Sequence, residues 1–209
     1  MSTVRLIVSG VTKEFNRRVI FRDISFFVSS GESVAITGRN GSGKSTLLKI
    51  ICGLLSPTRG TVEFSEDGRS RKAEDMRNLL GFVSPYLQLY EEFSGVENLE
   101  LLGRIRGDRE HGSDCTKELL SRVGLWERRN DMVRTYSSGM KLRLKYAFAL
   151  AHTPAILVLD EPTSNLDAEG EQMVRLIVEQ QKTTGILIVA TNDVEEARLC
   201  SSVVELEPR

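Results

Sequence analysis

Nine residues decide the fold of this chain: Gly38-Arg39-Asn40-Gly41-Ser42-Gly43-Lys44-Ser45-Thr46. A largely apolar run, 33–37, precedes this stretch and a second, 47–51, follows it, which is the order strand, glycine-rich loop and helix. In that context the pattern G-x-x-x-x-G-K-[ST] indicates a phosphate-binding loop, whose backbone N–H groups turn toward phosphate oxygens. The start of the helix adds the positive end of its dipole. We therefore expect all nine residues to bind a nucleoside triphosphate.

Two side chains of this loop carry the expected chemistry. Lys44 is expected to neutralise the β- and γ-phosphates, and the Ser45 hydroxyl to bind Mg²⁺. The alternative is a glycine-rich turn that only joins a strand to a helix. The complete motif in its strand-to-helix context favours the phosphate-binding interpretation.

Length, charge and cysteine content limit the classes of protein. The 209 residues suit one globular domain, or one domain with an inserted subdomain. With 28 basic and 29 acidic residues the formal net charge is -1, so nothing global recruits nucleic acid or an anionic membrane surface. No apolar run approaches the roughly 18–20 residues that span a bilayer, and the N-terminus lacks a signal-peptide pattern. Cys52, Cys115 and Cys200 lack metal-ligand spacing, which favours idle thiols in a reducing cytoplasm.

The remaining apolar segments predict an α/β fold. Uniformly apolar strands alternate with helices, which indicates a mainly parallel sheet covered on both faces. The expected strands are 3–8, 24–28, 61–64, 79–83, 155–160, 186–190 and 202–206, and the expected core helices are 44–53, 167–182 and a short one from Asp193. Residues 65–78 are charged and are expected to form a surface excursion. Helical segments over about 96–123 and 137–151, with a polar break at 107–113, indicate an inserted helical subdomain.

The second strong motif is Ile156-Leu157-Val158-Leu159-Asp160-Glu161-Pro162. Its four apolar residues predict a central strand that delivers Asp160 to the carboxyl edge of the sheet, where the ligands of such sheets collect. Asp160 is expected to hold Mg²⁺ through water, and Glu161 to polarise an attacking water as general base or orienting group. Helix capping is the alternative role for either acid, and the phosphate-binding loop upstream disfavours it.

Two further motifs resemble those of the ATP-binding cassette (ABC) ATPase family. The run Tyr136-Ser137-Ser138-Gly139-Met140-Lys141-Leu142-Arg143 resembles the family's signature sequence, which is Leu-Ser-Gly-Gly-Gln followed by basic residues. The run Ser164-Asn165-Leu166-Asp167 resembles its D-loop. The resemblance covers nearly the whole chain and implies a P-loop NTPase with an N-terminal antiparallel β-subdomain. It also implies one ABC ATPase domain over 1–209, with about 84–151 forming the Q-loop region and helical subdomain and about 1–83 and 152–209 forming the core.

The resemblance assigns roles to residues outside the phosphate loop. It implies that Ser137 and Gly139 of one copy face the loop of a second copy, in a head-to-tail dimer that encloses two ATP molecules. Asp167 belongs to the same nucleotide site. A hydroxyl and free N–H groups at a helix N-terminus suit an anion. Taken alone, the motif favours an ordinary N-cap role for Ser137 or Ser138, and the resemblance reverses that preference. Phe15 falls where an aromatic ring stacks on adenine, and packing against the sheet is the alternative.

Two departures from the family's pattern concern hydrolysis. The family has a glutamine near Mg²⁺ and the attacking water after the strand 79–83, and that position holds Pro85. Gln88, three residues later, is the candidate replacement as a metal-site residue if the loop shifts. Asn192 stands where the family has a histidine after the last core strand, and it can donate a hydrogen bond to the γ-phosphate but cannot shuttle a proton. We expect ATP binding to survive both changes and turnover to be slowed.

These motifs favour the motor of a transporter. The resemblance implies an ATPase subunit that docks from the cytoplasmic side onto a separate multi-span permease, with 84–105 and the helical insert forming the docking groove. The stretch 89–99 and the signature are most similar to the exporter branch that includes drug, polysaccharide and haem exporters. Two alternatives stay open: a regulatory ATP-binding subunit with little turnover, motivated by Pro85 and Asn192, and a soluble ABC ATPase that acts on ribosomes or DNA. A kinase or GTPase would leave the signature unexplained.

Overall fold

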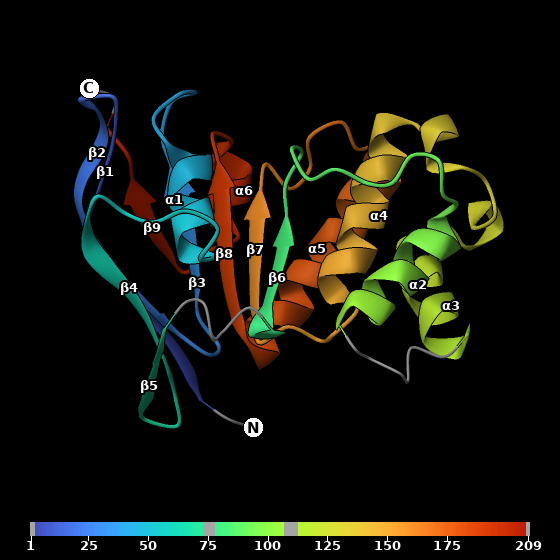
Figure 1. Cartoon of the computed structure of the whole chain (residues 1–209), viewed down its shortest axis with the longest axis horizontal. Helices are drawn as coiled ribbons and strands as arrows, with labels where there is room; N and C mark the ends of the chain where they lie inside the picture. Colours follow the sequence, from blue (N-terminus) through green and yellow to red (C-terminus); the bar gives the residue numbers. More distant parts are fainter. Residues whose placement is uncertain (1–2, 73–77, 107–112, 208–209) are drawn as a thin grey trace.

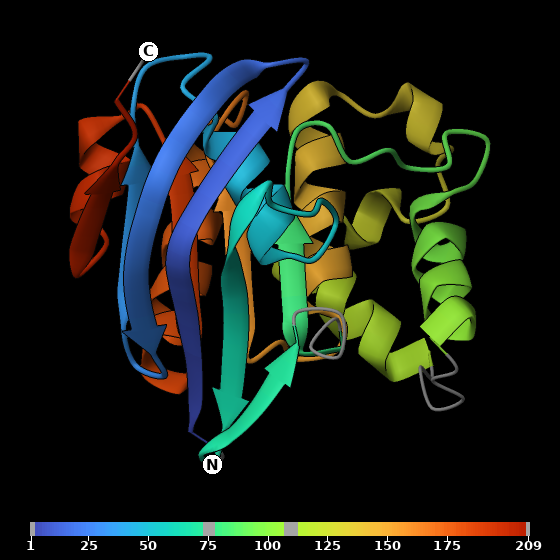
Figure 2. The same cartoon turned by 60° about the vertical axis from the view of Figure 1, so that its left-hand side comes forward.

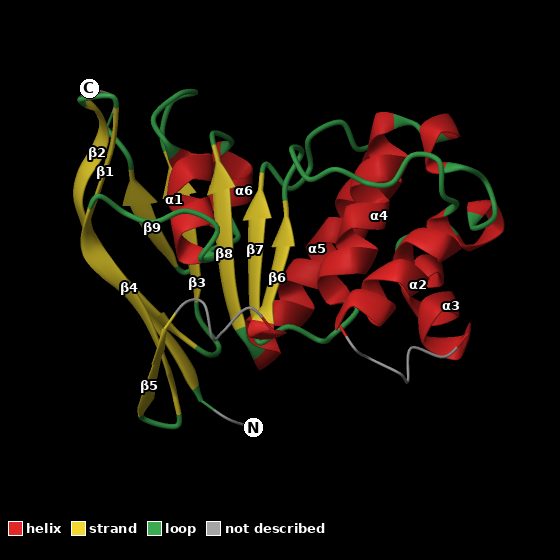
Figure 3. Ribbon diagram, in the orientation of Figure 1, coloured by secondary structure: helices red, strands yellow, loops and turns green. Residues whose placement is uncertain are grey.

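The computed structural model describes residues 3–72, 78–106 and 113–207, and these form three adjacent parts (Figure 1). An antiparallel sheet lies on one side, a parallel sheet with its helices lies in the middle, and a group of helices lies on the other side. Figure 3 shows that the strands are confined to the first two parts. Apart from Ser113, the polar break expected at 107–113 lies outside the described residues.

The parallel sheet has the strand order β6-β7-β8-β3-β9. Its strands are β6 (Leu80–Val83), β7 (Ile156–Asp160), β8 (Ile186–Thr191), β3 (Ser33–Thr37) and β9 (Ser202–Glu205). Each neighbouring pair is parallel, so the carboxyl ends of all these strands lie at one edge of the sheet. β7 and β8 are buried along their whole length, as uniformly apolar sequences predict.

Successive side chains of a strand point to opposite faces of the sheet, so each strand contributes to two separate cores. A different layer covers each face. On one face, Ile156 and Val158 of β7 pack in a core with α1 (Lys44–Ile51) and with strands of the antiparallel sheet. On the other face, Leu157 and Leu159 pack with α4 (Ser138–Leu150) and α5 (Ala168–Thr184). The short helix α6 (Val194–Arg198) follows β8. The predicted α/β fold with helices on both faces of a parallel sheet is confirmed.

The antiparallel sheet forms a separate layer, which Figure 2 shows in front of the parallel one. Its strand order is β2-β1-β4-β5, with β1 (Val4–Phe15), β2 (Arg18–Ser29), β4 (Arg59–Glu66) and β5 (Arg69–Lys72). β1 and β2 are longer than predicted because Asn16 and Arg17, with φ values of 47° and 65°, make a tight turn directly between them. The predicted surface excursion over 65–78 is therefore wrong in part, because β4 extends to Glu66 and β5 occupies Arg69–Lys72.

The helical part contains α2 (Gly95–Arg106), α3 (Ser113–Arg122), α4 and two short 3-10 helices, η2 (Trp126–Arg128) and η3 (Val133–Thr135). A capping box begins α2: the Ser94 N–H donates to the Glu97 carboxylate at 2.8 Å, and the Glu97 N–H donates to Ser94 Oγ at 3.3 Å. The Ser94 N–H and the Ser94 hydroxyl, which donates to the same carboxylate at 2.7 Å, lower the pKa of Glu97. None of the described helices combines the length and apolar character needed to cross a membrane.

No disulfide links the cysteines of the described residues. Cys52, Cys115 and Cys200 are free. Burial raises the pKa of the Cys52 thiol to about 12 and that of the Cys200 thiol to about 11. Both thiols therefore stay protonated at neutral pH, and a protonated thiol is a poor nucleophile.

Candidate active site

The loop between β3 and α1 forms one wall of a cavity of about 610 Å³ beside the carboxyl edge of the parallel sheet. Six of the nine residues predicted from the motif line it: Asn40, Gly41, Gly43, Lys44, Ser45 and Thr46. The other lining residues are Ile20, Lys49, Tyr86 and Glu161. The cavity therefore brings the phosphate loop together with Glu161, which lies more than a hundred residues further along the chain.

Glycines are required by the backbone of this loop. Gly38, Gly41 and Gly43 have φ values of 143°, 83° and 101°, in a region that residues with side chains rarely adopt. A side chain at Gly43 would also meet Ile20 at 2.5 Å. α1 begins directly after Gly43 without a side-chain cap, so the N–H groups of its first turn remain available to an anion.

The ammonium of Lys44 lies inside the loop. The residue is 6% exposed, and its Nζ donates to the carbonyl oxygen of Gly38 at 2.8 Å and to that of Arg39 at 3.4 Å. Lys44 takes part in none of the ion pairs found among the described residues. Carbonyl oxygens contact its ammonium directly, and Asp160 interacts with it electrostatically without forming one of those ion pairs, which suits a lysine that binds phosphate.

The carboxyl group of Asp160 lies at the end of β7 and is 1% exposed. The Ser84 hydroxyl donates to Oδ2 at 3.2 Å, whereas Oδ1 has no hydrogen-bond partner among the described residues. Burial raises the pKa of Asp160, and the neighbouring groups of Ser45, Ser84 and Lys44 lower it in part. A buried carboxylate oxygen without a partner, close to a serine hydroxyl, fits Mg²⁺, which proteins bind through one or two such ligands together with phosphate oxygens and water.

Glu161 and Asn192 meet at the phosphate loop from two different strands. Glu161 follows β7 with a φ of 50°, and its N–H donates to the Ala190 carbonyl of β8 at 2.9 Å. A left-handed conformation of a residue other than glycine costs on the order of 1–3 kcal/mol and clusters at active sites. Asn192 follows β8, and its Nδ2 donates to Asn40 Oδ1 at 3.1 Å. Glu161, Asn192 and Asn40 line a second cavity of about 260 Å³ beside the first.

Gln88 does not reach these residues. It lines a separate cavity of about 340 Å³, together with Pro85, Leu87, Leu89, Glu91, Lys141 and Lys145. The loop is fixed by Lys145 of α4, which is 8% exposed and whose Nζ donates to the carbonyls of Ser84 at 3.2 Å and Pro85 at 2.6 Å. The side chain of this loop that contacts Asp160 is that of Ser84, and the metal-site role of Gln88 stays a prediction.

Phe15 lies outside the cavity, at the last position of β1. It is 44% exposed, and the Lys13 ammonium lies 4.7 Å from its ring centre. The residue of this hairpin that lines the cavity is Ile20. These contacts do not distinguish stacking of Phe15 on adenine from packing against the sheet. The role of Phe15 stays a prediction.

The predicted signature and D-loop residues act as helix caps within one chain. Ser137 caps α4 by accepting the N–H three residues later at 3.2 Å, and Asp167 caps α5 in the same way at 2.9 Å. The capped N–H and Arg143, at 2.5 Å, lower the pKa of Asp167. A side chain at Gly139 would meet the Asn165 carbonyl at 2.9 Å, so the signature lies against the D-loop. None of Ser137, Gly139 and Asp167 lines the phosphate cavity of its own chain.

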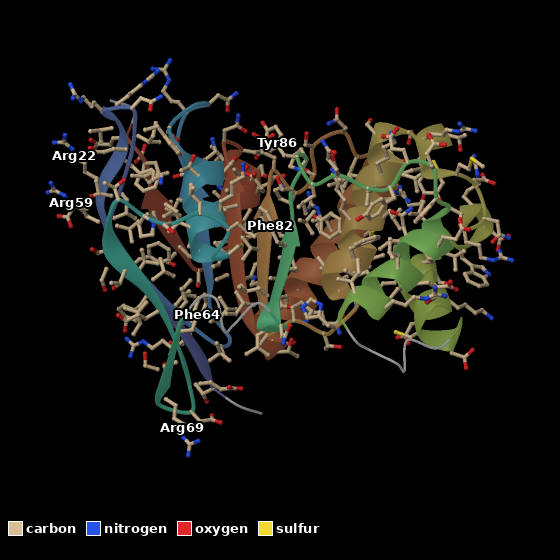
Figure 4. The ribbon with its side chains drawn as sticks, viewed as in Figure 1. Arg22, Arg59, Phe64, Arg69, Phe82 and Tyr86 are labelled. Atoms are coloured by element: carbon tan, nitrogen blue, oxygen red, sulfur yellow. The ribbon has the colours of Figure 1, made fainter. Side chains whose placement is uncertain are left out.

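Sequence reasoning missed Ile20, Lys49, Ser84 and Tyr86. Lys49 lies one helical turn beyond Ser45 on α1, so helical spacing could have placed it near the cavity. Tyr86 lies beyond the carboxyl end of β6 (Figure 4) and is 72% exposed. The centre of its ring lies 5.9 Å from the Lys49 ammonium. Nothing in the sequence distinguishes Ser84 or Tyr86 from other loop residues, because their positions depend on where the loop after β6 turns.

Comparisons with known proteins agree with this geometry. The family model described as ABC transporter matches residues 21–164. The chain is 36% identical to the lipoprotein-releasing system ATP-binding protein LolD of Protochlamydia amoebophila, over 98% of this chain and 95% of that protein. It is 34% identical to the Nod factor export ATP-binding protein I of Bradyrhizobium diazoefficiens, over 99% of this chain and 69% of that protein. A solved dimeric post-hydrolysis state of the ATP-binding cassette MJ0796, bound to ADP and Pi, superimposes with a TM-score of 0.84 at 27% identity, over 98% of this chain and 96% of that chain.

The fold and the site define a P-loop nucleotide hydrolase built on a parallel sheet. The chain belongs to the ABC transporter family. It is an ATP-binding subunit with the ATPase activity of that family, which confirms the predicted fold, function and activity. A third relative, the lantibiotic transport ATP-binding protein SrtF of Streptococcus pyogenes, is 33% identical over 90% of this chain and 79% of that protein. The relatives come from different transport systems and do not resolve the predicted branch of exporters.

The buried Asp160 carboxyl makes stability depend on pH. Its raised pKa means that the folded chain keeps this proton to a higher pH than the unfolded chain does. Its contribution to stability is therefore complete below about pH 3.9, the ordinary pKa of aspartate, and is lost as the pH rises through the folded-state value. Without nucleotide, Asp160→Asn is expected to raise the free energy of unfolding at pH 7, and this gain is expected to vanish toward pH 4. Urea denaturation of both proteins between pH 4 and 7.5 measures it, and a gain that is independent of pH would contradict it.

Proposed function

We propose that two copies of this chain enclose two ATP molecules head to tail, and that the dimer drives export through a separate multi-span permease. One observation carries the proposal: Lys44, Ser45 and Glu161 gather at one cavity, whereas Ser137 and Gly139 of the same chain lie outside it. One copy thus supplies the phosphate loop but not the signature. A C2 arrangement supplies each loop with the partner's signature, and the solved dimer of a related cassette supports it.

The residues of each site divide the chemistry. Backbone N–H groups of 38–46 bind the phosphates, and Lys44 neutralises their charge. Ser45 and Asp160 would hold Mg²⁺, which would supply stabilisation of the charge that develops on the phosphoryl oxygens. Glu161 orients or deprotonates the attacking water, and Asn192 donates a hydrogen bond to the γ-phosphate.

The remaining residues assigned to the nucleotide site lie around the phosphate cavity. The β1–β2 hairpin contributes Ile20 to the cavity, and the exposed ring of Phe15 on the same hairpin is assigned to the adenine base. Arg143 holds Asp167 and thereby ties the signature helix to the D-loop. We assign one ABC ATPase domain to 1–209, with about 84–151 as its helical subdomain.

Glu161→Gln is expected to abolish phosphate release and to trap an ATP-dependent dimer, because an amide cannot accept the proton of the attacking water. The uncharged side chain also removes a negative charge from the dimer interface. Size-exclusion chromatography with light scattering, with and without ATP, reports the dimer, and a phosphate assay reports turnover. Glu179→Gln is the matched control, since Glu179 lies on α5 and its ion pair within the described ranges is with Lys182. Unchanged hydrolysis by Glu161→Gln would remove Glu161 from the mechanism.

A site shared between two copies predicts complementation. Lys44→Ala and Ser137→Arg are each expected to be inactive, because every site of either homodimer lacks one partner. In an equal mixture, half of the dimers are mixed and each has one complete site, so activity is expected to return to about a quarter of the wild-type rate. The control mixture combines Lys44→Ala with a chain that carries both substitutions, and no complete site can form there. Equal rates in the two mixtures would contradict the shared site.

The surface around the β6–α2 loop supports docking of a permease. Tyr86, Leu87, Tyr90 and Phe93 are all at least 37% exposed, and the rings of Tyr90 and Phe93 stack at 5.6 Å. Exposed aromatic side chains gathered on one loop are typical of an interaction surface. In this family the expected partner of such a surface is a permease. The subunit would contact it at the cytoplasmic face of the membrane.

Replacing Tyr90 and Phe93 together by alanine is expected to lower permease-stimulated ATPase activity about tenfold or more, as loss of aromatic anchors does at interfaces. Basal activity is expected to stay unchanged, since neither ring lines the phosphate cavity. The measurement compares ATPase rates with and without the partner permease. Phe27→Ala is the control, because Phe27 is 60% exposed on β2 in the antiparallel sheet. Undiminished stimulation would contradict the docking surface.

A further inference from the structure

The carboxylate of Glu196 accepts hydrogen bonds from the loop after β7 and from the end of β8. The Thr163 N–H donates to its Oε1 at 3.2 Å, and the Thr163 hydroxyl donates to the same oxygen. The Thr191 hydroxyl donates to Oε2. Glu196 is 9% exposed and belongs to none of the ion pairs found among the described residues. A nearly buried acid held only by these donors is costly to desolvate, so it calls for a role that an apolar side chain could not fill.

The two threonines stand next to the two proposed hydrolytic residues. Thr163 lies two positions beyond Glu161, in the loop that leaves β7, and Thr191 is the last residue of β8, directly before Asn192. Glu196 and both threonines line the 260 Å³ cavity that also contains Glu161 and Asn192. The carboxylate therefore joins the backbone segments that present these two side chains to the phosphate loop.

The position of Glu196 is itself fixed. Asp193 caps α6 by accepting the N–H of Glu195 at 2.6 Å and that of Glu196 at 3.3 Å. The Asp193 N–H in turn donates to the Thr191 hydroxyl oxygen at 2.9 Å. The start of α6, the end of β8 and the loop after β7 thus share one hydrogen-bond network. Networks of this kind hold their members in a single geometry when every group is satisfied.

We propose that Glu196 is a positioning residue for ATP hydrolysis, which ties the Glu161 loop to the Asn192 loop so that both side chains reach the same γ-phosphate. The proposal rests on the roles of Glu161 and Asn192 assigned above. Glu196 itself touches neither nucleotide nor water in this scheme and acts through Thr163 and Thr191.

The chemistry of the network distinguishes a carboxylate from an amide. Glu196 offers two acceptor oxygens to three donors, whereas glutamine offers one acceptor oxygen and two N–H groups. In Glu196→Gln the amide N–H would face the Thr191 hydroxyl oxygen, which already accepts the Asp193 N–H. Glutamine is therefore expected to keep the Thr163 contact and to disturb Thr191, while alanine loses both contacts.

The test measures kcat and ATP affinity separately. Glu196→Ala is expected to lower kcat about ten- to a hundredfold, because misplaced catalytic groups lose rate steeply, while the Kd for ATP stays within about threefold. Glu196→Gln is expected to lie between Glu196→Ala and the wild type. The matched controls are Glu195→Ala and Glu195→Gln, since Glu195 lies beside Glu196 on α6 with a side chain 74% exposed and paired with Arg198. Both controls are expected to retain wild-type kcat.

A double-mutant cycle with Thr163→Val gives a second readout. If Glu196 acts through Thr163, the double variant is expected to lose little more kcat than Glu196→Ala alone. Independent losses that multiply would overturn the proposal, and so would a fall in ATP affinity equal to the fall in kcat. If Glu196→Ala does not fold, the same double-mutant cycle is measured with Glu196→Gln and Thr191→Val.

Asn192→Ala and Glu161→Gln are measured alongside to separate the two levels of inference. If these two variants hydrolyse ATP normally, the proposed function of the site fails. If they are impaired while Glu196→Ala keeps wild-type kcat, the proposal for Glu196 alone is overturned.

Discussion

The parallel pairing of β3, β7 and β8 is the constraint on which the nucleotide site depends. Thr37 of β3 pairs with Thr191 of β8, and Ala190 of β8 pairs with Asp160 of β7, so the three strands end level with one another. The phosphate loop, the Asp-Glu pair and Asn192 then follow from the same edge on adjacent strands. A shift of one residue in β7 would turn Asp160 to the opposite face of the sheet and separate it from Ser45.

The site holds a buried cation and a buried acid, and bound ATP with its metal would supply an opposite charge to each. Lys44 is a buried cation held by carbonyl oxygens, and Asp160 is a buried acid with one oxygen bound by a hydroxyl and the other without a partner. Each group has lost much of its hydration without gaining an opposite charge in contact, which costs free energy in the empty protein. A phosphate next to Lys44 and a cation next to Asp160 supply those opposite charges. Ligand binding therefore recovers free energy that the folded chain gives up.

Most of the fold and the centre of the site could be predicted because they depend on local patterns. The glycines and Lys44 form a contiguous motif, and the apolar run before Asp160 identifies a buried strand wherever it occurs. The loop after β6 could not be predicted in this way. Its course depends on Lys145, a residue sixty positions away on α4, which holds the Pro85 carbonyl and leaves Gln88 in another cavity. The contacts of Glu196 could not be predicted for the same reason, since its two threonine partners lie after β7 and at the end of β8, and only the folded sheet brings them together.

The Lys145 contact has a mechanical consequence. Burial and the nearby Lys141 lower the pKa of Lys145, and the described ion pairs give it no carboxylate, so carbonyl dipoles alone retain its ammonium. Dipoles hold a cation over a narrower range of distance than a full opposite charge does. A small displacement of α4 would therefore release the Ser84–Pro85 segment instead of dragging it along. The same segment carries the Ser84 hydroxyl that contacts Asp160, so the position of α4 bears on the geometry of the candidate metal site.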